Sequence, residues 1–407
     1  MKLKFSFLLV ALMASLFLFA QKPVFISTKG QEVIGTDGKP FLMRGTNLGN
    51  WLVPEGYMFH FKKATSPRLI NQAFNELIGE EATSRFWKKF LDTYITHDDI
   101  KYLKSTGINS IRIPFNYRLF TNENYMGDND STRGFTYLDR AIEWCRQEGL
   151  YVMLDMHCAP AGQTGDNIDD SYGYPYLFTD EVAQQKTIDI WKRIAAHYAD
   201  DTLILGYDVL NEPIAHYFDT AFLNPKLEPL YKRIVSAVRE ADPHHIILLG
   251  GAQWDSNFRI FGKPFANNLI YTFHKYWTAT DKSVIQDYID FRDKYNVPLY
   301  CGETGENNDQ WVKEFRQTLE ANNIGWHFWP YKKLSNTRGF ATFDVPEYYT
   351  QVIAYADTTR NSFADIRAFR PANTAQIVKA LNGYLENAQF KNCHKNEGYI
   401  RALGLKP

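Results

Sequence analysis

The stretch that decides the fold is Leu205–His216, which reads LGYDVLNEPIAH. Residues 205–210 are mainly apolar, as expected of a buried strand in a parallel sheet. This strand nevertheless ends in an amide and a carboxyl group, those of Asn211 and Glu212. Burying an ionisable carboxyl group is costly unless a partner or a reaction requires it. The same combination of a buried strand and a polar ending recurs along the chain.

Seven further apolar runs resemble this one. The eight runs cover residues 41–49, 107–115, 150–158, 203–213, 244–251, 268–276, 297–303 and 324–329. Helical periodicity lies between most of them, at 84–105, 137–149, 180–199 and 227–241. This alternation predicts an α/β fold with a parallel sheet, and eight strands close best as a (β/α)8 TIM barrel. A doubly wound open sheet is the alternative, but no glycine-rich phosphate turn follows an early strand.

Other segments flank the predicted barrel. Residues 25–41 alternate and turn at Asp37–Gly38, which predicts an N-terminal β-hairpin. Residues 331–372 form a long excursion after strand eight, which we expect to shape the rim of a site. The last predicted helix covers 373–388. Because no repeat or low-complexity linker divides the chain, residues 21–407 are expected to form one domain.

Residues 1–20 have the pattern of a secretory signal peptide. Lys2 and Lys4 precede an apolar stretch, Phe5–Phe19, and Ala20 precedes Gln21. The protein is therefore expected to be secreted, periplasmic or on the cell surface. No later apolar run is long enough to span a bilayer. An uncleaved anchor is the alternative, because Leu18 occupies a position where signal peptidase favours a small residue.

The composition argues against several kinds of partner. The net charge is -1 at pH 7 and no basic run is present, so nucleic acid and anionic membranes are not expected partners. Aromatic residues make up 15% of the chain, which suits stacking against sugar rings. The four cysteines are too few for a disulfide scaffold, and no metal-ligand spacing was found. We expect a monomer that needs no cofactor and no metal.

In a TIM barrel, side chains at the carboxyl ends of the strands face the active site. Candidate residues follow six of the strands: Arg112 (second), His157 (third), Asn211 and Glu212 (fourth), His274 and Tyr276 (sixth), Glu303 (seventh) and Trp329 (eighth). Two carboxyl groups in one enclosed pocket suit glycoside hydrolysis, in which one protonates the leaving oxygen and the other attacks the anomeric carbon.

The neighbouring residue types suit the same reaction. The acid must keep its proton near neutral pH, while the nucleophile must stay ionised. Arg112 and Tyr276 can donate hydrogen bonds to an ionised nucleophile. Asn211 can donate to a sugar 2-hydroxyl, and Trp329 offers a flat face to the sugar ring. The two histidines supply further polar contacts.

The ordered set RIP, LDMH, LNEP, HKY, GE and FW resembles glycoside hydrolase family 5 of the cellulase superfamily, and the likeness runs from Arg44 to Trp329. The resemblance implies a retaining glycosidase without a cofactor. It also implies that Glu212 is the acid/base and Glu303 the nucleophile. Arg112, His157, Asn211, His274, Tyr276 and Trp329 match the other characteristic site positions of the family.

Two stretches narrow the resemblance. Residues 44–56, RGTNLGNWLVPEG, and 156–167, MHCAPAGQTGDN, are similar to the branch containing yeast-type exo-β-1,3-glucanases. This implies that Glu55 and Asp166 contact the non-reducing-end sugar. Asn50 and Cys158 replace glycines of that branch, so the exo or endo mode and the linkage stay open. The expected substrate is a β-linked oligo- or polysaccharide, a β-glucan or β-glucoside, with mannan or a glycolipid as alternatives.

Two other functions fit less well. A non-catalytic carbohydrate-binding barrel should have lost a carboxyl group, and both are present. A metal-dependent hydrolase needs a His-x-His or Glu/Asp/His ligand set at the strand ends, which is missing. Asp155 and Asp208 lie inside strands and are expected to support the barrel interior. Lys332 and Lys333 are expected on a solvated rim.

Overall fold

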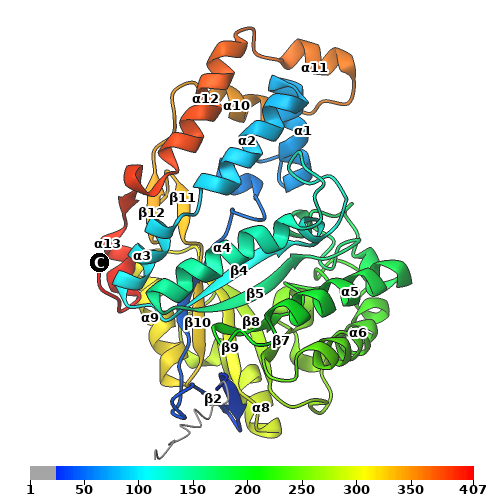
Figure 1. Ribbon diagram of the computed structural model, residues 1–407, viewed down its shortest axis with the longest axis vertical. Coiled ribbons are helices and arrows are strands. Elements are labelled where there is room, and N and C mark those ends of the chain that lie inside the picture. The colour runs from blue at the N-terminus through cyan, green and yellow to red at the C-terminus, as the bar shows by residue number, and fades with distance from the viewer. Residues whose placement is uncertain (1–23) are drawn as a thin grey trace, which may run out of the picture.

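The computed structural model describes residues 24–407, so the predicted signal peptide lies outside the described residues. Eight parallel strands close a barrel in the order β10-β3-β4-β5-β6-β7-β8-β9, which confirms the predicted TIM barrel (Figure 1). The barrel strands are β3 (Arg44–Asn47), β4 (Ser110–Asn116), β5 (Tyr151–Cys158), β6 (Ile204–Asp208), β7 (Ile246–Gly250), β8 (Leu269–Tyr276), β9 (Leu299–Gly305) and β10 (Gly325–Trp329).

Helices connect most of the strands. They are α1 (Pro67–Ile78), α2 (Glu80–Thr93), α3 (His97–Thr106), α4 (Arg133–Glu148), α5 (Glu181–Tyr198), α6 (Thr220–Ala241), α7 (Ala252–Asp255), α8 (Gln286–Tyr295) and α9 (Asp309–Ala321). Short 3-10 turns add η1 (Gly56–Phe59), η2 (Tyr117–Phe120), η3 (Asn167–Asp169), η4 (Tyr176–Phe178), η5 (Phe258–Ile260) and η6 (Lys282–Ile285). The crossover from β7 to β8 contains only α7 and η5, so no full helix covers the barrel there.

The prediction of one helix over residues 84–105 is wrong in one respect, because this segment forms parts of two helices. The chain leaves α2 at Thr93 and begins α3 at His97. Thr96 caps α3, and its backbone N–H and hydroxyl each donate to Asp99 Oδ2 at 2.8 Å. This capping box satisfies N–H groups that a continuous helix would have bonded internally.

The N-terminal hairpin consists of β1 (Ser27–Lys29) and β2 (Glu32–Ile34) and closes the lower end of the barrel in Figure 1. Strands β1 and β2 are joined by a turn at Gly30, where φ is 58°, which was not predicted. The chain turns again at Asp37–Gly38, as predicted, and Ile34 and Pro40 form an antiparallel bridge there. Around the hairpin one buried cluster forms from Ile26, Val33, Met43, Met153, Leu205, Ile246, Leu248, Ile270 and Tyr300. The apolar interior therefore fills this end and leaves the carboxyl ends of the strands for a site.

The excursion after β10 is partly ordered as a small sheet of β11 (Lys332–Leu334), β12 (Ala341–Phe343) and β13 (His394–Lys395). It continues through α10 (Tyr349–Ala356), α11 (Phe363–Phe369), α12 (Thr374–Asn387) and η7 (Phe390–Asn392) to α13 (Glu397–Ala402). The predicted last helix corresponds to α12 and is followed by α13. Helices α1, α2, α10, α11 and α12 form a lobe that stands out from the barrel, as Figure 1 shows.

Lys332 and Lys333 are buried, so the prediction of a solvated rim is wrong for both. Lys332 Nζ lies 2.6 Å from Asp99 Oδ1 and donates to the backbone oxygens of Tyr94 and Ala388 at 2.8 Å. Lys333 Nζ lies 2.6 Å from Glu306 Oε1. Strand β11 runs between the lobe and the barrel (Figure 1), so side chains on both of its faces are covered.

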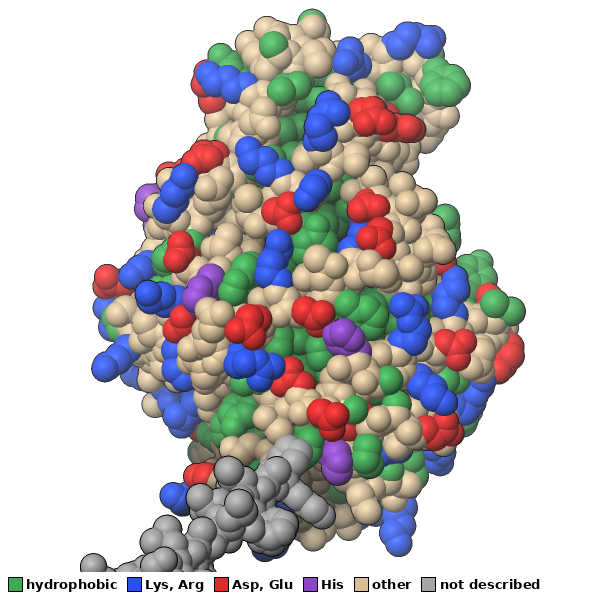
Figure 2. Space-filling view, viewed as in Figure 1, with side chains coloured by type: hydrophobic (Ala, Val, Ile, Leu, Met, Phe, Trp, Pro, Cys, Tyr) green, Lys and Arg blue, Asp and Glu red, His purple; other side chains and the backbone are tan. Residues whose placement is uncertain are grey.

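The surface carries charges of both signs close together, as Figure 2 shows for one face. This pattern agrees with the net charge of -1. Among residues 24–407, no helix combines the length and apolar character that crossing a bilayer requires.

Candidate active site

A cavity of about 740 Å³ opens at the carboxyl ends of the barrel strands. It contains seven of the predicted site residues: Glu55, His157, Glu212, His274, Tyr276, Glu303 and Trp329. Arg112 and Asn211 are fully buried and bonded to each other, and Arg112 also contacts Glu303. Asp166 is not among the lining residues, although Ile168 of the same loop is. The barrel thus brings together residues that are up to 274 positions apart in the chain (Glu55 to Trp329).

Arg112 organises the floor of this cavity. Its Nη1 donates to Glu303 Oε1 at 2.6 Å and to Asn47 Oδ1 at 3.0 Å. Its Nη2 donates to Asn211 Oδ1 at 2.9 Å, and its Nε donates to Asp208 Oδ2 at 2.9 Å. A rigid guanidinium fork held by four partners has little freedom to move. It therefore fixes the Glu303 carboxylate against the barrel.

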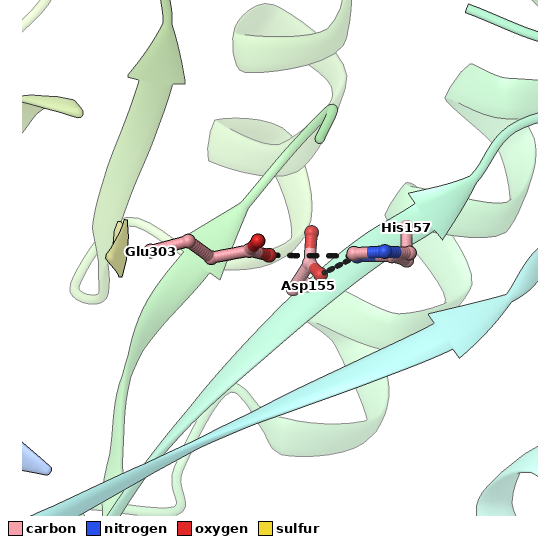
Figure 3. A group of neighbouring side chains, drawn as sticks. All are labelled: Asp155, His157 and Glu303. Carbon is pink, nitrogen blue, oxygen red and sulfur yellow. Dashed lines mark hydrogen bonds and ion pairs between the residues drawn. The ribbon is translucent and has the colours of Figure 1, made fainter. Parts of the chain in front are cut away.

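Glu303 receives hydrogen bonds on both carboxylate oxygens. Oε1 accepts from Arg112, and Oε2 accepts from the Tyr276 hydroxyl at 3.1 Å. His157 Nδ1 lies 3.9 Å from Oε1, and Figure 3 shows dashed lines from this imidazole to both Glu303 and Asp155. Donors on both oxygens stabilise the ionised form of a carboxyl group. Both oxygens of Glu303 are thus held by donors at the edge of the cavity.

Glu212 has a different environment. Burial raises the pKa of its carboxyl group to about 7, against the lowering influence of His157 and Arg112. Its Oε1 lies 2.8 Å from His274 Nδ1. A carboxyl group that is partly protonated near pH 7 can donate a proton to a leaving oxygen and later take one from water.

The backbone around Glu212 is strained. Glu212 and Ile214 have φ of 47° and 58°, in the left-handed region that disfavours residues with a Cβ. Each such residue costs about 1–2 kcal/mol. Strain of this kind persists only where the surroundings enforce it and is concentrated at functional sites.

The two site histidines are neutral. Burial lowers the pKa of His157 to about 4 and that of His274 to about 3. Asp155 Oδ2 lies 2.8 Å from His157 Nδ1 (Figure 3), which orients this ring. Burial also raises the pKa of Asp155 and Asp208 to about 7, although Arg112 opposes this. These two aspartates support the site from within the barrel.

The carboxyl groups of Glu212 and Glu303 face one another across the cavity. One oxygen of each, together with a nitrogen of His274, lies within 4.8 Å of the other two. Retaining glycosidases hold their carboxyl groups about 5–5.5 Å apart, whereas inverting enzymes leave about 6.5–9.5 Å for a water molecule. The spacing in this site is suited to direct attack by a carboxylate.

Two groups of side chains have the spacing of metal ligands. They are Asp155, His157 and Glu303, and Glu212, His274 and Glu303. The Arg112 guanidinium already lies 2.6 Å from Glu303 and 3.1 Å from Asp155. A second cation beside these oxygens would be repelled by this buried positive charge. The donor set is therefore better suited to binding the arginine than a metal ion.

Trp329 lines the cavity, whereas Asn211 is fully buried behind it. Asn211 Oδ1 accepts from Arg112, while its Nδ2 has no hydrogen-bond partner within residues 24–407. The Trp329 ring stacks on His157 with centroids 5.6 Å apart, and its Nε1 donates to the Tyr57 hydroxyl at 2.6 Å. A Cβ at Gly49 would lie 2.7 Å from the Trp329 ring, so this glycine leaves room for the indole.

Glu55 and Asp166 have different positions. Glu55 lies in the cavity wall, where burial and the charges of Glu303 and Glu212 raise the pKa of its carboxyl group. Its backbone N–H donates to Asn50 Oδ1 at 3.0 Å, and Asn50 itself has φ of 65°. Asp166 instead accepts a hydrogen bond from the Tyr217 hydroxyl. Asp166 thus lies outside the cavity in which we expected it.

Several residues in and around the site were not predicted, among them Asn47, Asp255, Tyr57 and Glu306. Asn47 ends the first barrel strand and could have been found from the same strand-end pattern. Asp255 follows the glycine pair that ends the fifth strand. No polar residue was predicted at the end of that strand. Tyr57 lies in η1 and Glu306 directly follows β9, and the Tyr57 hydroxyl donates to Glu306 Oε1 at 3.3 Å. No signal in the sequence pairs these two residues.

The family model described as Cellulase (glycosyl hydrolase family 5) matches residues 71–335. A beta-xylosidase of Phanerodontia chrysosporium is 34% identical over 256 residues, covering 62% of this chain and 52% of that protein. Endoglucanase C of Acetivibrio thermocellus is 26% identical, covering 61% and 87%. A glucan 1,3-beta-glucosidase of Candida oleophila is 28% identical, covering 77% and 76%. The chain thus spans about half the length of the xylosidase.

Solved structures share the fold. The crystal structure of an endogalactoceramidase aligns with a TM-score of 0.56 at 17% identity, covering 76% of this chain and 75% of that chain. At this level of identity the likeness concerns the fold alone. Chemistry must be argued from the site.

Proposed function

Because the chain belongs to glycosyl hydrolase family 5, we propose that it is a retaining glycoside hydrolase that cleaves β-glycosidic bonds by double displacement. Glu303 attacks the anomeric carbon, and Glu212 protonates the departing oxygen. In the second step Glu212 takes a proton from water, which releases the sugar from Glu303. The observation that carries the proposal is the pair of facing carboxyl groups, with oxygens within 4.8 Å and contrasting surroundings.

The remaining site residues have supporting roles. Arg112 and Tyr276 donate to the two oxygens of Glu303, and Asn211 holds Arg112 through its Oδ1. Trp329 supplies an apolar face for the ring. No step requires a metal ion or an organic cofactor.

The proposed substrate is a β-glucan or a β-glucoside. The relatives named glucan 1,3-beta-glucosidase and endoglucanase support a glucose-based substrate, whereas the relative named beta-xylosidase extends the range to other β-linked sugars. Mannan and glycolipids are alternative substrates. We also propose that residues 1–20 direct export and are removed, so that the monomeric mature protein begins at Gln21.

A screen of defined β-linked oligosaccharides tests this function. Proton NMR should show the β-anomer of the product first, and product sizes distinguish exo from endo cleavage. Initial release of the α-anomer would show inversion and contradict the mechanism. Mass spectrometry of exported protein should give a mass that begins at Gln21. A retained Lys2–Lys4 segment would indicate an anchor instead.

A further inference from the structure

Asp255 is a buried carboxyl group that the proposed reaction does not use. It is the last residue of α7, its side chain is 0% exposed, and burial and the charges of Asp208 and Glu212 raise its pKa. An unused ionisable group beside two site residues requires a reason, because burying it is costly.

The backbone that carries Asp255 is strained. Gln253, Trp254 and Asp255 have φ of 52°, 63° and 57°, three consecutive left-handed residues without a glycine. A Cβ at Gly250 would lie 1.9 Å from Asp255 Oδ1, so only glycine leaves room for this carboxyl group. Both features place the carboxyl group at one particular position, which is next to Glu212.

Asp255 makes two contacts there. Its Oδ2 accepts the backbone N–H of Glu212 at 3.2 Å. The same oxygen lies 3.3 Å from His274 Nε2, which has no hydrogen-bond partner within residues 24–407. The other ring nitrogen, His274 Nδ1, lies 2.8 Å from Glu212 Oε1. The three side chains therefore form a continuous row, Asp255–His274–Glu212.

We propose that Asp255 is a positioning residue for Glu212, which acts through His274 and through the Glu212 backbone N–H. The inference rests on Glu212 being the acid/base under the proposed function. A neutral imidazole carries one N–H. With that proton on Nε2, the nitrogen that Asp255 Oδ2 approaches to 3.3 Å, Nδ1 accepts a hydrogen bond from the protonated Glu212 carboxyl group. Asp255 thereby favours the proton-donating form of Glu212 and holds its carboxyl group in place.

Other ionisable groups also act on Glu212. They are Glu55 from the β3–α1 connection, Arg112 from β4, Asp155 and His157 from β5, His274 and Tyr276 from β8, and Glu303 from β9, whereas Asp208 from β6 acts on Asp255. None of these except His274 has a contact with both Asp255 and the Glu212 side chain in the described chain. The effect of changing Asp255 should therefore pass through His274 and through the Glu212 backbone N–H.

The test compares Asp255→Gly and Asp255→Asn with the parent enzyme. Glycine suits φ of 57° and removes the carboxyl group, whereas asparagine keeps an uncharged acceptor oxygen. Each protein is assayed on the β-linked oligosaccharide that the parent hydrolyses and on the dinitrophenyl glycoside of the same sugar. The second substrate has a leaving group that needs little protonation.

For Asp255→Gly we expect kcat on the oligosaccharide to fall about tenfold or more with KM little changed. On the dinitrophenyl glycoside the rate of glycosylation should fall about threefold at most. The alkaline limb of kcat/KM should move to lower pH, because His274 is then free to donate to ionised Glu212. Asp255→Asn should show the same changes to a smaller extent, because asparagine keeps an acceptor oxygen at this position.

A matched control is Asp242→Asn. Asp242 is also a buried carboxyl group that contacts a histidine, His245, but it precedes β7 at the opposite end of the barrel. This variant should lower thermal stability without changing leaving-group dependence or the pH profile.

The proposal is overturned if Asp255→Gly folds and its rates depend on the leaving group as the parent's do, with the alkaline limb of kcat/KM at the parent's pH. If that variant does not fold, parent-like values in Asp255→Asn overturn it equally. Failure of the proposed function itself looks different. In that case the parent hydrolyses no β-glycoside, or Glu212→Ala retains the parent's activity.

Discussion

The guanidinium of Arg112 and the carboxylate of Glu303 form a buried ion pair with Nη1 and Oε1 2.6 Å apart. The same guanidinium also contacts Asp155 and Asp208, at 3.1 and 2.9 Å. One positive charge therefore lies among three carboxyl groups, of which only Glu303 borders the open cavity. Glu303 is thus held by a cation, whereas burial raises the pKa of Glu212 to about 7.

The first prediction concerns the nucleophile. Glu303→Gln keeps the shape of the side chain but removes the attacking oxygen. Hydrolysis should fall at least about 1,000-fold on every substrate, whatever its leaving group. Steady-state rates on an oligosaccharide and on a dinitrophenyl glycoside measure this. A loss confined to one of the two substrates would contradict the role of Glu303.

The second prediction concerns the acid/base. Glu212→Ala should lose far more activity on an oligosaccharide than on an activated aryl glycoside, which needs little proton donation. Release of the glycosyl group still lacks its base, so a burst followed by slow turnover is expected. Azide should restore turnover and give a β-glycosyl azide from a β-glycoside. Equal losses on both substrates would mean that Glu212 is not the acid.

The third prediction concerns pH. Only protonated Glu212 can act as the acid, and the pKa of this group is raised to about 7. Activity on the oligosaccharide should therefore be present below pH 7 and fall about tenfold per pH unit above it. The alkaline limb of kcat/KM measures this pKa in the free enzyme. A limb near the ordinary glutamate pKa would be incompatible with the assignment.

A fourth prediction concerns the cavity wall. Lys333 Nζ bonds both oxygens of Glu306, at 2.6 and 2.7 Å, and Glu306 accepts from Tyr57, which in turn accepts from Trp329. Lys333→Met should loosen this row and raise KM severalfold, with a smaller effect on kcat. Lys391→Met, on an exposed lysine, is the control and should leave both constants unchanged. A change in kcat alone would place Lys333 in the chemistry instead.

The fifth prediction concerns stability. Lys332→Met leaves Asp99 buried without its cation, so the free energy of unfolding should fall by about 3–5 kcal/mol. Denaturant unfolding measures this change. The double variant Lys332→Met/Asp99→Leu removes both charges and should recover part of the loss. A single variant as stable as the parent would show that the pair contributes nothing.

Much of the barrel could be predicted from the sequence because its information is local. The apolar runs, the helical periods between them and the polar residues at the strand ends are all legible in short windows. These local patterns were enough to predict the eight strands and the family. They also predicted that nine of the ten site residues belong to one buried site. Only Asp166 lies away from the cavity in which it was expected.

Some outcomes depended on contacts between distant parts of the chain. The burial of Lys332 depends on β11 being covered by a lobe that residues 67–93 and 349–387 build together. The position of Asp255 depends on a strained turn and on the space above Gly250. Neither can be read in a short window, because burial and strain arise from what packs against a segment.

The sequence by itself determined which residue types stand at the ends of the strands, and thereby the kind of reaction. Only the tertiary structure decided their different environments. Arg112 and Tyr276 bond to Glu303, while Glu212 is desolvated and paired with His274. The physical reason is that a carboxyl group's proton affinity depends on its burial and on nearby charges, which barrel closure sets.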